Sequence, residues 1–324
     1  MTFKTPPTVK RSDGEPRCVG FELEFTGLTL QQTSDQLQRA LGGTIRHHSA
    51  AEHSLETDDL GTFNIELDWG YLKRKADQAQ SEDEGHEWVD FLQKAATLVV
   101  PIEVVCPPIA VHDLSALDRM VEFLREAGAK GTEDSLIAAF GVHINPEIPS
   151  LDAPTLDRYL KAFALLQWWL VRAHQVDVSR KVTPFVDLYP EAYLKAVLEA
   201  SQPDMDQIIS AYLEHNATRN RALDMLPMLA EIDEKRVRAA VDDDNIKARP
   251  TFHYRLPNCM IETPGWSLAS SWNLWWVVEQ LAENPKHLAS LGKELLDSSR
   301  LLLGVNRKKW VERMQQWLSD QGWA

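Results

Sequence analysis

The fold is decided by one stretch near the start of the chain, Cys18-Val19-Gly20-Phe21-Glu22-Leu23-Glu24-Phe25. After the glycine, apolar and acidic residues alternate, which predicts a β-strand with two different faces. Phe21, Leu23 and Phe25 would pack against helices on one face. Glu22 and Glu24 would lie about 7 Å apart on the other face, where they repel each other unless a cation is bound between them. A divalent cation is the natural partner. The alternative, for this strand alone, is an edge strand with a solvated polar face.

Four further stretches alternate in the same way and also gather their polar residues on one side. These residues are Glu66 and Asp68 in 62–69, Glu103 in 99–106, His143 and Asn145 in 140–146, and His253 and Arg255 in 250–257. Solvated faces usually carry Lys, Thr, Ser and Gln, so this repetition of carboxylates and histidines indicates a shared acidic front. Glu103 stands alone among apolar residues, where a carboxylate is costly unless it is paired or bound to a metal.

The five strands predict an α+β fold with a curved, mainly antiparallel sheet. Its concave face would be acidic, and helices would pack on the other side. Residues 151–245 read as a helical insert and residues 268–324 as a helical C-terminus rich in tryptophan, which fits either a core or the interface of a homo-oligomer. The polar, proline-rich residues 1–17 predict a flexible N-terminal tail, and residues 18–324 a single domain.

Charge and composition exclude several classes of protein. The net charge of −14 argues against duplex nucleic acid and against an anionic membrane surface as partners, because both need a basic surface. The N-terminus has no apolar signal segment, and the longest apolar run, around 162–171, is too short to span a membrane. The three cysteines form no C-x-x-C pair, so no zinc or redox motif is indicated. We therefore expect a cytoplasmic protein.

The polar residues of the shared face suit a particular chemistry. Oxygen ligands with an imidazole favour Mg²⁺ or Mn²⁺, and several carboxylates near arginines suit two or three such ions that hold a nucleoside triphosphate. Two predicted loops carry arginines: Arg180 in one, and Arg219 and Arg221 in the other. These arginines are either surface charge or phosphate ligands. The chain has neither a P-loop nor a Rossmann glycine motif.

The order of the motifs resembles the amidoligase family of the glutamine synthetase and glutamate–cysteine ligase superfamily. The resembling segments lie between about residues 18 and 262: Gly20-Phe21-Glu22-Leu23-Glu24-Phe25, Glu103-Val104-Val105-Cys106-Pro107-Pro108, Gly141-Val142-His143-Ile144-Asn145, Arg219-Asn220-Arg221 and Tyr254-Arg255-Leu256-Pro257. The resemblance implies a curved antiparallel sheet with helices on its back, in a catalytic domain that makes an amide from a carboxylate and an amine with the use of ATP.

The resemblance also assigns roles to residues. Glu22, Glu24 and Glu103 would bind metal, and His143 would bind metal or phosphate with Asn145 beside it. Arg255 would contact phosphates. The strand pattern adds Glu66 as a metal ligand and Asp68 as a catalytic carboxylate.

One position departs from the family, whose last strand usually carries a glutamate two residues before the arginine. This chain has His253 there. Three alternatives stay open: His253 is a metal ligand, Glu262 takes the role, or one metal site is lost.

The function implied is an ATP-dependent carboxylate–amine ligase with ATP and Mg²⁺ or Mn²⁺ as cofactors. The γ-phosphoryl group would pass to a substrate carboxylate, while Arg180, Arg219, Arg221 and Arg255 hold phosphates and stabilise the acyl phosphate. The substrates would be small-molecule or peptide carboxylates and amines, and a glutamine-amidotransferase-like protein is a partner by analogy. The alternatives are a metal-dependent hydrolase without ATP and a degenerate binding or scaffold protein, which nucleotide and metal binding distinguish.

Overall fold

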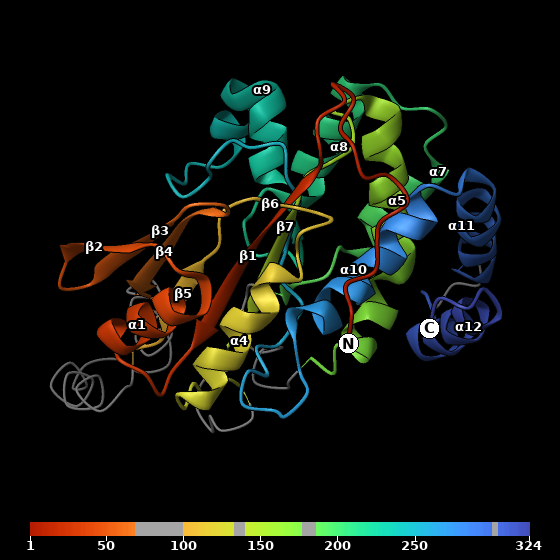
Figure 1. Ribbon diagram of the computed structural model, residues 1–324. Coiled ribbons are helices and arrows are strands. Elements are labelled where there is room, and N and C mark those ends of the chain that lie inside the picture. Colours follow the sequence, from red (N-terminus) through yellow and green to blue (C-terminus); the bar gives the residue numbers. More distant parts are fainter. Residues whose placement is uncertain (69–99, 133–139, 177–185, 300–303) are drawn as a thin grey trace, which may run out of the picture.

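The computed structural model describes residues 1–68, 100–132, 140–176, 186–299 and 304–324 (Figure 1). The stretch quoted first is β1 (Cys18–Phe25), and its burial alternates along its length. Phe21, Leu23 and Phe25 are fully buried on one face, whereas Glu22 and Glu24 are only partly buried on the other. The period of two residues therefore separates an apolar back from a polar front, as the sequence predicts.

The strands form one antiparallel, unclosed sheet of nine strands within the described residues. Their order is β2-β3-β4-β5-β1-β7-β9-β8, with β6 paired to one end of β1. The other strands are β2 (Thr44–Ser49), β3 (Glu52–Thr57), β4 (Gly61–Leu67), β5 (Ile102–Val105), β6 (Ile109–Ala110), β7 (Val142–Pro146), β8 (Leu223–Asp224) and β9 (His253–Tyr254). The predicted α+β fold with an antiparallel sheet is confirmed.

Three local differences from the sequence prediction concern short segments. Residues 44–56 are polar and rich in histidine, and the sequence predicts one strand there without fixing its ends or its register. They form the hairpin β2–β3 instead, because the chain turns back at residues 50–51. Only two residues of 250–257 pair as β9, and β8 lies in a stretch expected to be helical. β8 and β9 pair through Leu223–Tyr254 and Asp224–His253, a contact between distant segments that no local pattern reveals.

Helices surround the apolar side of the sheet. The described helices are α1 (Leu30–Leu41), α4 (Ala116–Glu126), α5 (Ala153–Ala173), α7 (Glu191–Glu199), α8 (Met205–Asn216), α9 (Leu226–Ala240), α10 (Leu268–Ala282), α11 (Pro285–Ser299) and α12 (Arg307–Asp320). The helix α1 packs on α4, β3 and β4, and α10 packs on α5 (Figure 1). None of the described helices is long and apolar enough to cross a membrane.

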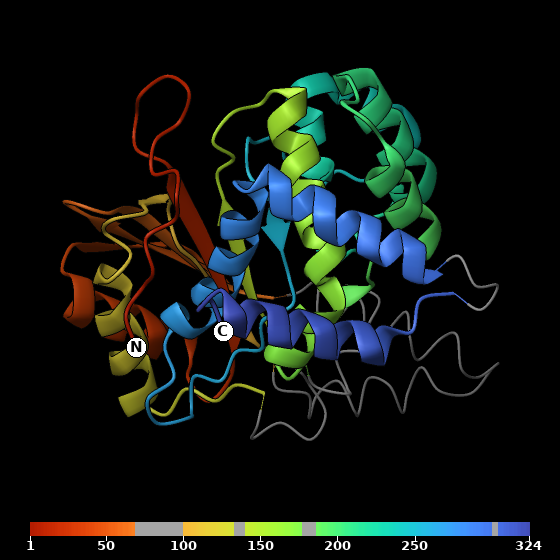
Figure 2. The ribbon, with the colours of Figure 1, turned by 90° about the vertical axis from the view of Figure 1, so that its right-hand side faces the viewer.

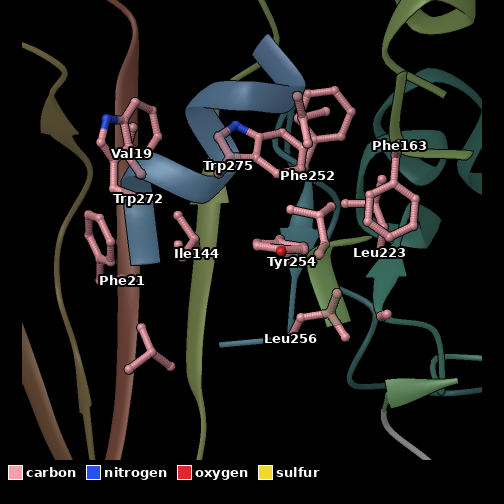
Figure 3. Packing of buried hydrophobic residues seen from close by; sticks show 14 of the residues in the cluster. Val19, Phe21, Ile144, Phe163, Leu223, Phe252, Tyr254, Leu256, Trp272 and Trp275 are labelled. Atoms are coloured by element: carbon pink, nitrogen blue, oxygen red, sulfur yellow. The ribbon is translucent and has the colours of Figure 1, made fainter. Parts of the chain in front are cut away.

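Aromatic side chains join α10 to the back of the sheet. Trp275 of α10 has its ring 5.2 Å from the rings of both Phe252 and Tyr254. Figure 3 shows Trp272 beside Val19 of β1, and Trp275 beside Phe252. Tyr254 is buried on this side, and the adjacent His253 must therefore turn to the front. Trp272 and Trp275 thus belong to the core under the acidic face, whereas Trp276 is only partly buried.

Within residues 1–17, predicted to be a flexible tail, residues 2–5 and Arg17 contact α10 (Figure 2). Trp272 and Trp276 donate their indole N–H groups to the carbonyls of Lys4 and Thr5. Arg17 is fully buried and forms an ion pair with Glu279 of α10 at 2.9 Å. The polar composition of this segment does not show these partners, because they lie more than 260 residues away in sequence.

Candidate functional site

The front of the sheet carries a row of four glutamates on adjacent strands. The strand register places Glu52 of β3 opposite Glu66 of β4, Glu66 opposite Glu103 of β5, and Glu103 opposite Glu24 of β1. We call these four residues the carboxylate row. Facing residues of neighbouring strands lie about 5 Å apart, so the charges repel each other. Glu52 was missed from sequence, because the register of residues 44–56 could not be read.

A second group, the Glu22 corner, lies beside this row and consists of Glu22, His143, Asn145 and His253. Glu22 and His143 face each other across β1 and β7, and His143 Nδ1 lies 2.8 Å from Glu22 Oε2. Asn145 donates its side-chain amide to Glu22 Oε1 at 2.9 Å. His253 Nε2 lies 3.6 Å from Glu22 Oε2. Glu22 is therefore surrounded by donors from its own chain.

The two groups differ in charge balance, and their pKa values show it. Burial alone would raise the pKa of Glu22, but His253 and His143 outweigh it and hold the pKa well below its usual value. The pKa of Glu103 is instead well above its usual value, through burial and the charges of Glu22 and Glu24. The pKa of Glu66 is also raised, by burial and by Glu52. The excess negative charge thus lies on the carboxylate row.

Two sets of side chains converge closely enough to hold a metal ion, among the residues that the structure describes. One set is Glu24, Glu103 and His143, and the other is Glu22, His143 and His253; in each, the ligand atoms lie within 4.8 Å of one another. The first set has two carboxylates and one imidazole, which suits Mg²⁺ or Mn²⁺. The raised pKa of Glu103 agrees with this, because a divalent cation would offset the repulsion that raises it.

The strands β8 and β9 bring an aspartate to the front that sequence analysis missed. Asp224 is fully buried, and Arg255 donates to its Oδ2 at 2.9 Å. Burial raises the pKa of Asp224, and Arg255 opposes this rise. Burial and Arg255 also hold the pKa of His253 well below its usual value. Asp224 is found only through its pairing with His253, since its own segment has no strand pattern.

A third missed residue is Arg249, in the segment before the last strand. Its guanidinium donates to Asn145 Oδ1 at 3.1 Å and to Thr251 Oγ1 at 3.0 Å. Because Asn145 in turn donates to Glu22, Arg249 is linked to the acidic face through one side chain. Burial lowers the pKa of Arg249, and Glu22 and Asp224 oppose that effect. A lone arginine between polar residues carries no signal in the sequence that distinguishes it from surface charge.

The arginines of the predicted phosphate site have different positions. Arg219 is half-buried and lies 3.3 Å from Asp243 Oδ2. Arg221 donates to the carbonyls of Leu188 and His215, so it joins the end of α8 to the segment before α7. Arg255 is buried beside Asp224. Arg180 lies outside the described residues.

Two further carboxylates were named from the sequence. Asp68 directly follows β4, where its backbone N–H donates to the carbonyl of Pro101, and its charge acts on Glu66 and Glu103. It therefore lies near the carboxylate row. Glu262 accepts a hydrogen bond from the backbone of Gly131 at 3.0 Å and belongs to neither converging set in the described part of the chain.

Comparison with known proteins identifies a family for this chain. The family model described as "Putative amidoligase enzyme" matches residues 15–277, which include every strand of the sheet. No curated protein and no solved structure matches the chain. The family match covers most of the chain and supports a ligase activity; this protein belongs to the amidoligase family.

Proposed function

We propose that this protein is an ATP-dependent ligase that joins a carboxylate to an amine through an acyl phosphate. The observation that carries the proposal is the uncompensated charge of Glu103 in the converging set with Glu24 and His143. A structural carboxylate would have a cation or several donors of its own chain. The side chain of Glu103 has neither among the described residues, and a metal–nucleotide complex would supply the missing positive charge.

The carboxylate row and His143 would hold Mg²⁺ or Mn²⁺. A divalent cation held by these residues would supply positive charge against the negative charge that develops in phosphoryl transfer. The position of the cation would be set by the sheet. The pairing of β4, β5, β1 and β7 fixes where each ligand side chain lies. Glu24 is also fixed by the backbone N–H of Gly141, which donates to its Oε2 at 2.9 Å.

Cationic side chains near β8 and β9 would orient the phosphates. Three arginines lie close enough to affect one another electrostatically. The charges of Arg219 and Arg255 both lower the pKa of Arg249. Such a group of guanidinium ions suits a triphosphate and the acyl phosphate that follows. Arg249 extends the set of arginines named from sequence, and Arg221 is held by backbone carbonyls.

The reaction would take place in two steps. The bond between the γ-phosphorus and the bridging oxygen of ATP breaks as a substrate carboxylate oxygen attacks, and ADP leaves. The amine then attacks the acyl carbon, inorganic phosphate leaves, and a carboxylate takes the proton of the amine. Asp68 is the candidate for this base, because it lies near the carboxylate row at the end of β4. The substrates would be a small-molecule or peptide carboxylate and an amine.

The test is calorimetric titration of the full chain with a non-hydrolysable ATP analogue, with and without Mg²⁺. We expect binding that requires the metal and that weakens at least tenfold in Glu103→Gln. Glu122→Gln is the matched control, because it makes the same chemical change at an exposed position of α4. The control should bind like the wild type.

The outcomes distinguish the alternatives. Metal binding without nucleotide binding would favour a hydrolase that uses the same ligands. If neither the metal nor the nucleotide binds, the proposed enzymatic function is wrong, and a binding or scaffold protein is the remaining alternative. If the nucleotide binds, ATP with hydroxylamine and a panel of carboxylates tests the chemistry, since an acyl phosphate reacts with hydroxylamine to form a hydroxamate.

A further inference from the structure

The neighbours of the two ring nitrogens of His253 show which nitrogen carries a hydrogen. Its Nδ1 lies 3.2 Å from the Nη2 of Arg255, in hydrogen-bond geometry. A guanidinium has only donors and is not deprotonated in proteins. The Nδ1 of His253 must therefore be the acceptor, and it carries no hydrogen.

An imidazole whose Nδ1 is an acceptor is neutral and carries its single hydrogen on Nε2. This Nε2 is the atom that faces the acidic side, 3.6 Å from Glu22 Oε2 and 3.4 Å from His143 Nδ1. A nitrogen that carries a hydrogen has no lone pair for a metal. To bind one there, His253 would have to move its hydrogen to Nδ1, directly against the donor of Arg255.

Two buried groups keep Arg255 in place. Arg255 donates to Asp224 at 2.9 Å with the same Nη2, and Asp224 is held in turn through the backbone N–H of Leu226 at 3.0 Å. Asp224 and Arg255 are both almost completely buried. Arg255 cannot move its donor away from the ring without breaking this buried ion pair, which is costly.

We propose that His253 is a positioning residue that presents an N–H to Glu22, and that it is not a metal ligand. The acidic face then binds its cation on Glu24, Glu103 and His143, and hydrogen-bond donors of the chain itself occupy the carboxylate of Glu22. Asn145 and His143 complete this corner, because they hydrogen-bond to the two oxygens of Glu22 at 2.9 and 2.8 Å. The inference rests on the proposed function in one respect, that a divalent cation binds this face.

The first experiment counts cations by titrating Mn²⁺ into the full chain. We expect one site in the wild type and two in His253→Glu, because a carboxylate could accept from Arg255 with one oxygen and offer the other to a metal beside Glu22. His253→Gln should keep one site, since its amide also presents an N–H towards Glu22 and adds no carboxylate. Two sites in the wild type, with one lost in His253→Gln, would overturn the inference. No Mn²⁺ binding in the wild type would instead overturn the proposed function.

A second measurement needs no variant, so it does not depend on whether a buried substitution folds. Nitrogen-15 NMR of histidine-labelled protein reports which ring nitrogen carries the hydrogen. We expect His253 to show the Nε2–H form before and after saturation with Mg²⁺, and His143 to change. A shift of the His253 hydrogen to Nδ1 on adding Mg²⁺ would contradict the proposal.

Discussion

Glu279 and Glu103 are carboxylates on opposite sides of the same sheet, and their surroundings differ completely. Glu279, on α10 behind the sheet, is fully buried and accepts hydrogen bonds from Arg17, Tyr159 and Trp275. Glu103, on the front, has other carboxylates as its neighbours. A carboxylate that the chain neutralises supports the fold. One that it leaves uncompensated awaits a proton or a cation from outside.

The largest expected effect is the loss of the buried ion pair. Replacing Arg17 with Met should lower the free energy of unfolding by about 3–5 kcal/mol, because Glu279 is left buried without its cation. Urea denaturation measures this. The double variant with Arg17→Met and Glu279→Leu should recover most of the loss, since neither charge remains. If Arg17→Met is as stable as the wild type, the ion pair between Arg17 and Glu279 does not stabilise the fold.

The second prediction concerns Glu103, where removing a charge should not lower the free energy of unfolding. Without metal, Glu103→Gln should be at least as stable as the wild type, because it removes a repelling charge at nearly the same volume. Mn²⁺ at one hundred times its dissociation constant should stabilise the wild type by about 2.7 kcal/mol, and this gain should be lost in the variant. Thermal denaturation with and without EDTA measures both. If Glu103→Gln without metal is less stable than the wild type, the carboxylate of Glu103 stabilises the fold as that of Glu279 does, which contradicts this prediction.

The third effect is a pH dependence that the raised pKa of Glu103 predicts. A carboxyl group with a raised pKa in the folded state favours folding while it is protonated. This contribution is complete below the usual glutamate pKa of about 4.3, and it is lost as the pH rises through the raised value. In EDTA, the stability of the wild type relative to Glu103→Gln should therefore fall as the pH rises. The same comparison with Glu122→Gln should show no such fall, and equal slopes would contradict the assignment.

The smallest effect is expected at the surface. Arg46 lies 3.1 Å from Glu56 between β2 and β3, but both side chains are at least half exposed. Replacing Arg46 with Gln should change the free energy of unfolding by less than about 1 kcal/mol, because water solvates both ions. A loss as large as that of Arg17→Met would mean that burial does not explain the difference between the regions.

The sequence predicted much of the site, because the signals were local. Alternation in β1 separates Glu22 and Glu24 from the apolar face, and the same period places Glu66, Glu103 and His143 on the front. Asn145 was also found in this way, and the structure adds that it holds Glu22. These assignments need only the period of two residues within each strand.

The residues that the sequence missed depend on pairing between distant segments. Glu52 joins the carboxylate row only through the register of β3 on β4, and Asp224 reaches the front only through β8 and β9. Arg249 contacts Asn145 across 104 residues of sequence. Register is a property of two strands together, so it cannot be read from either one.

The sequence by itself determined the chemistry of this protein: an acidic sheet face, an apolar back and the glutamates and histidine that converge on the front. Only the tertiary structure decided the charge state of each group. It neutralised Glu279 with Arg17, surrounded Glu22 with donors, and left Glu103 among carboxylates. The reason is that a residue type sets which charges a group can carry, whereas burial and neighbouring atoms decide which charge it does carry.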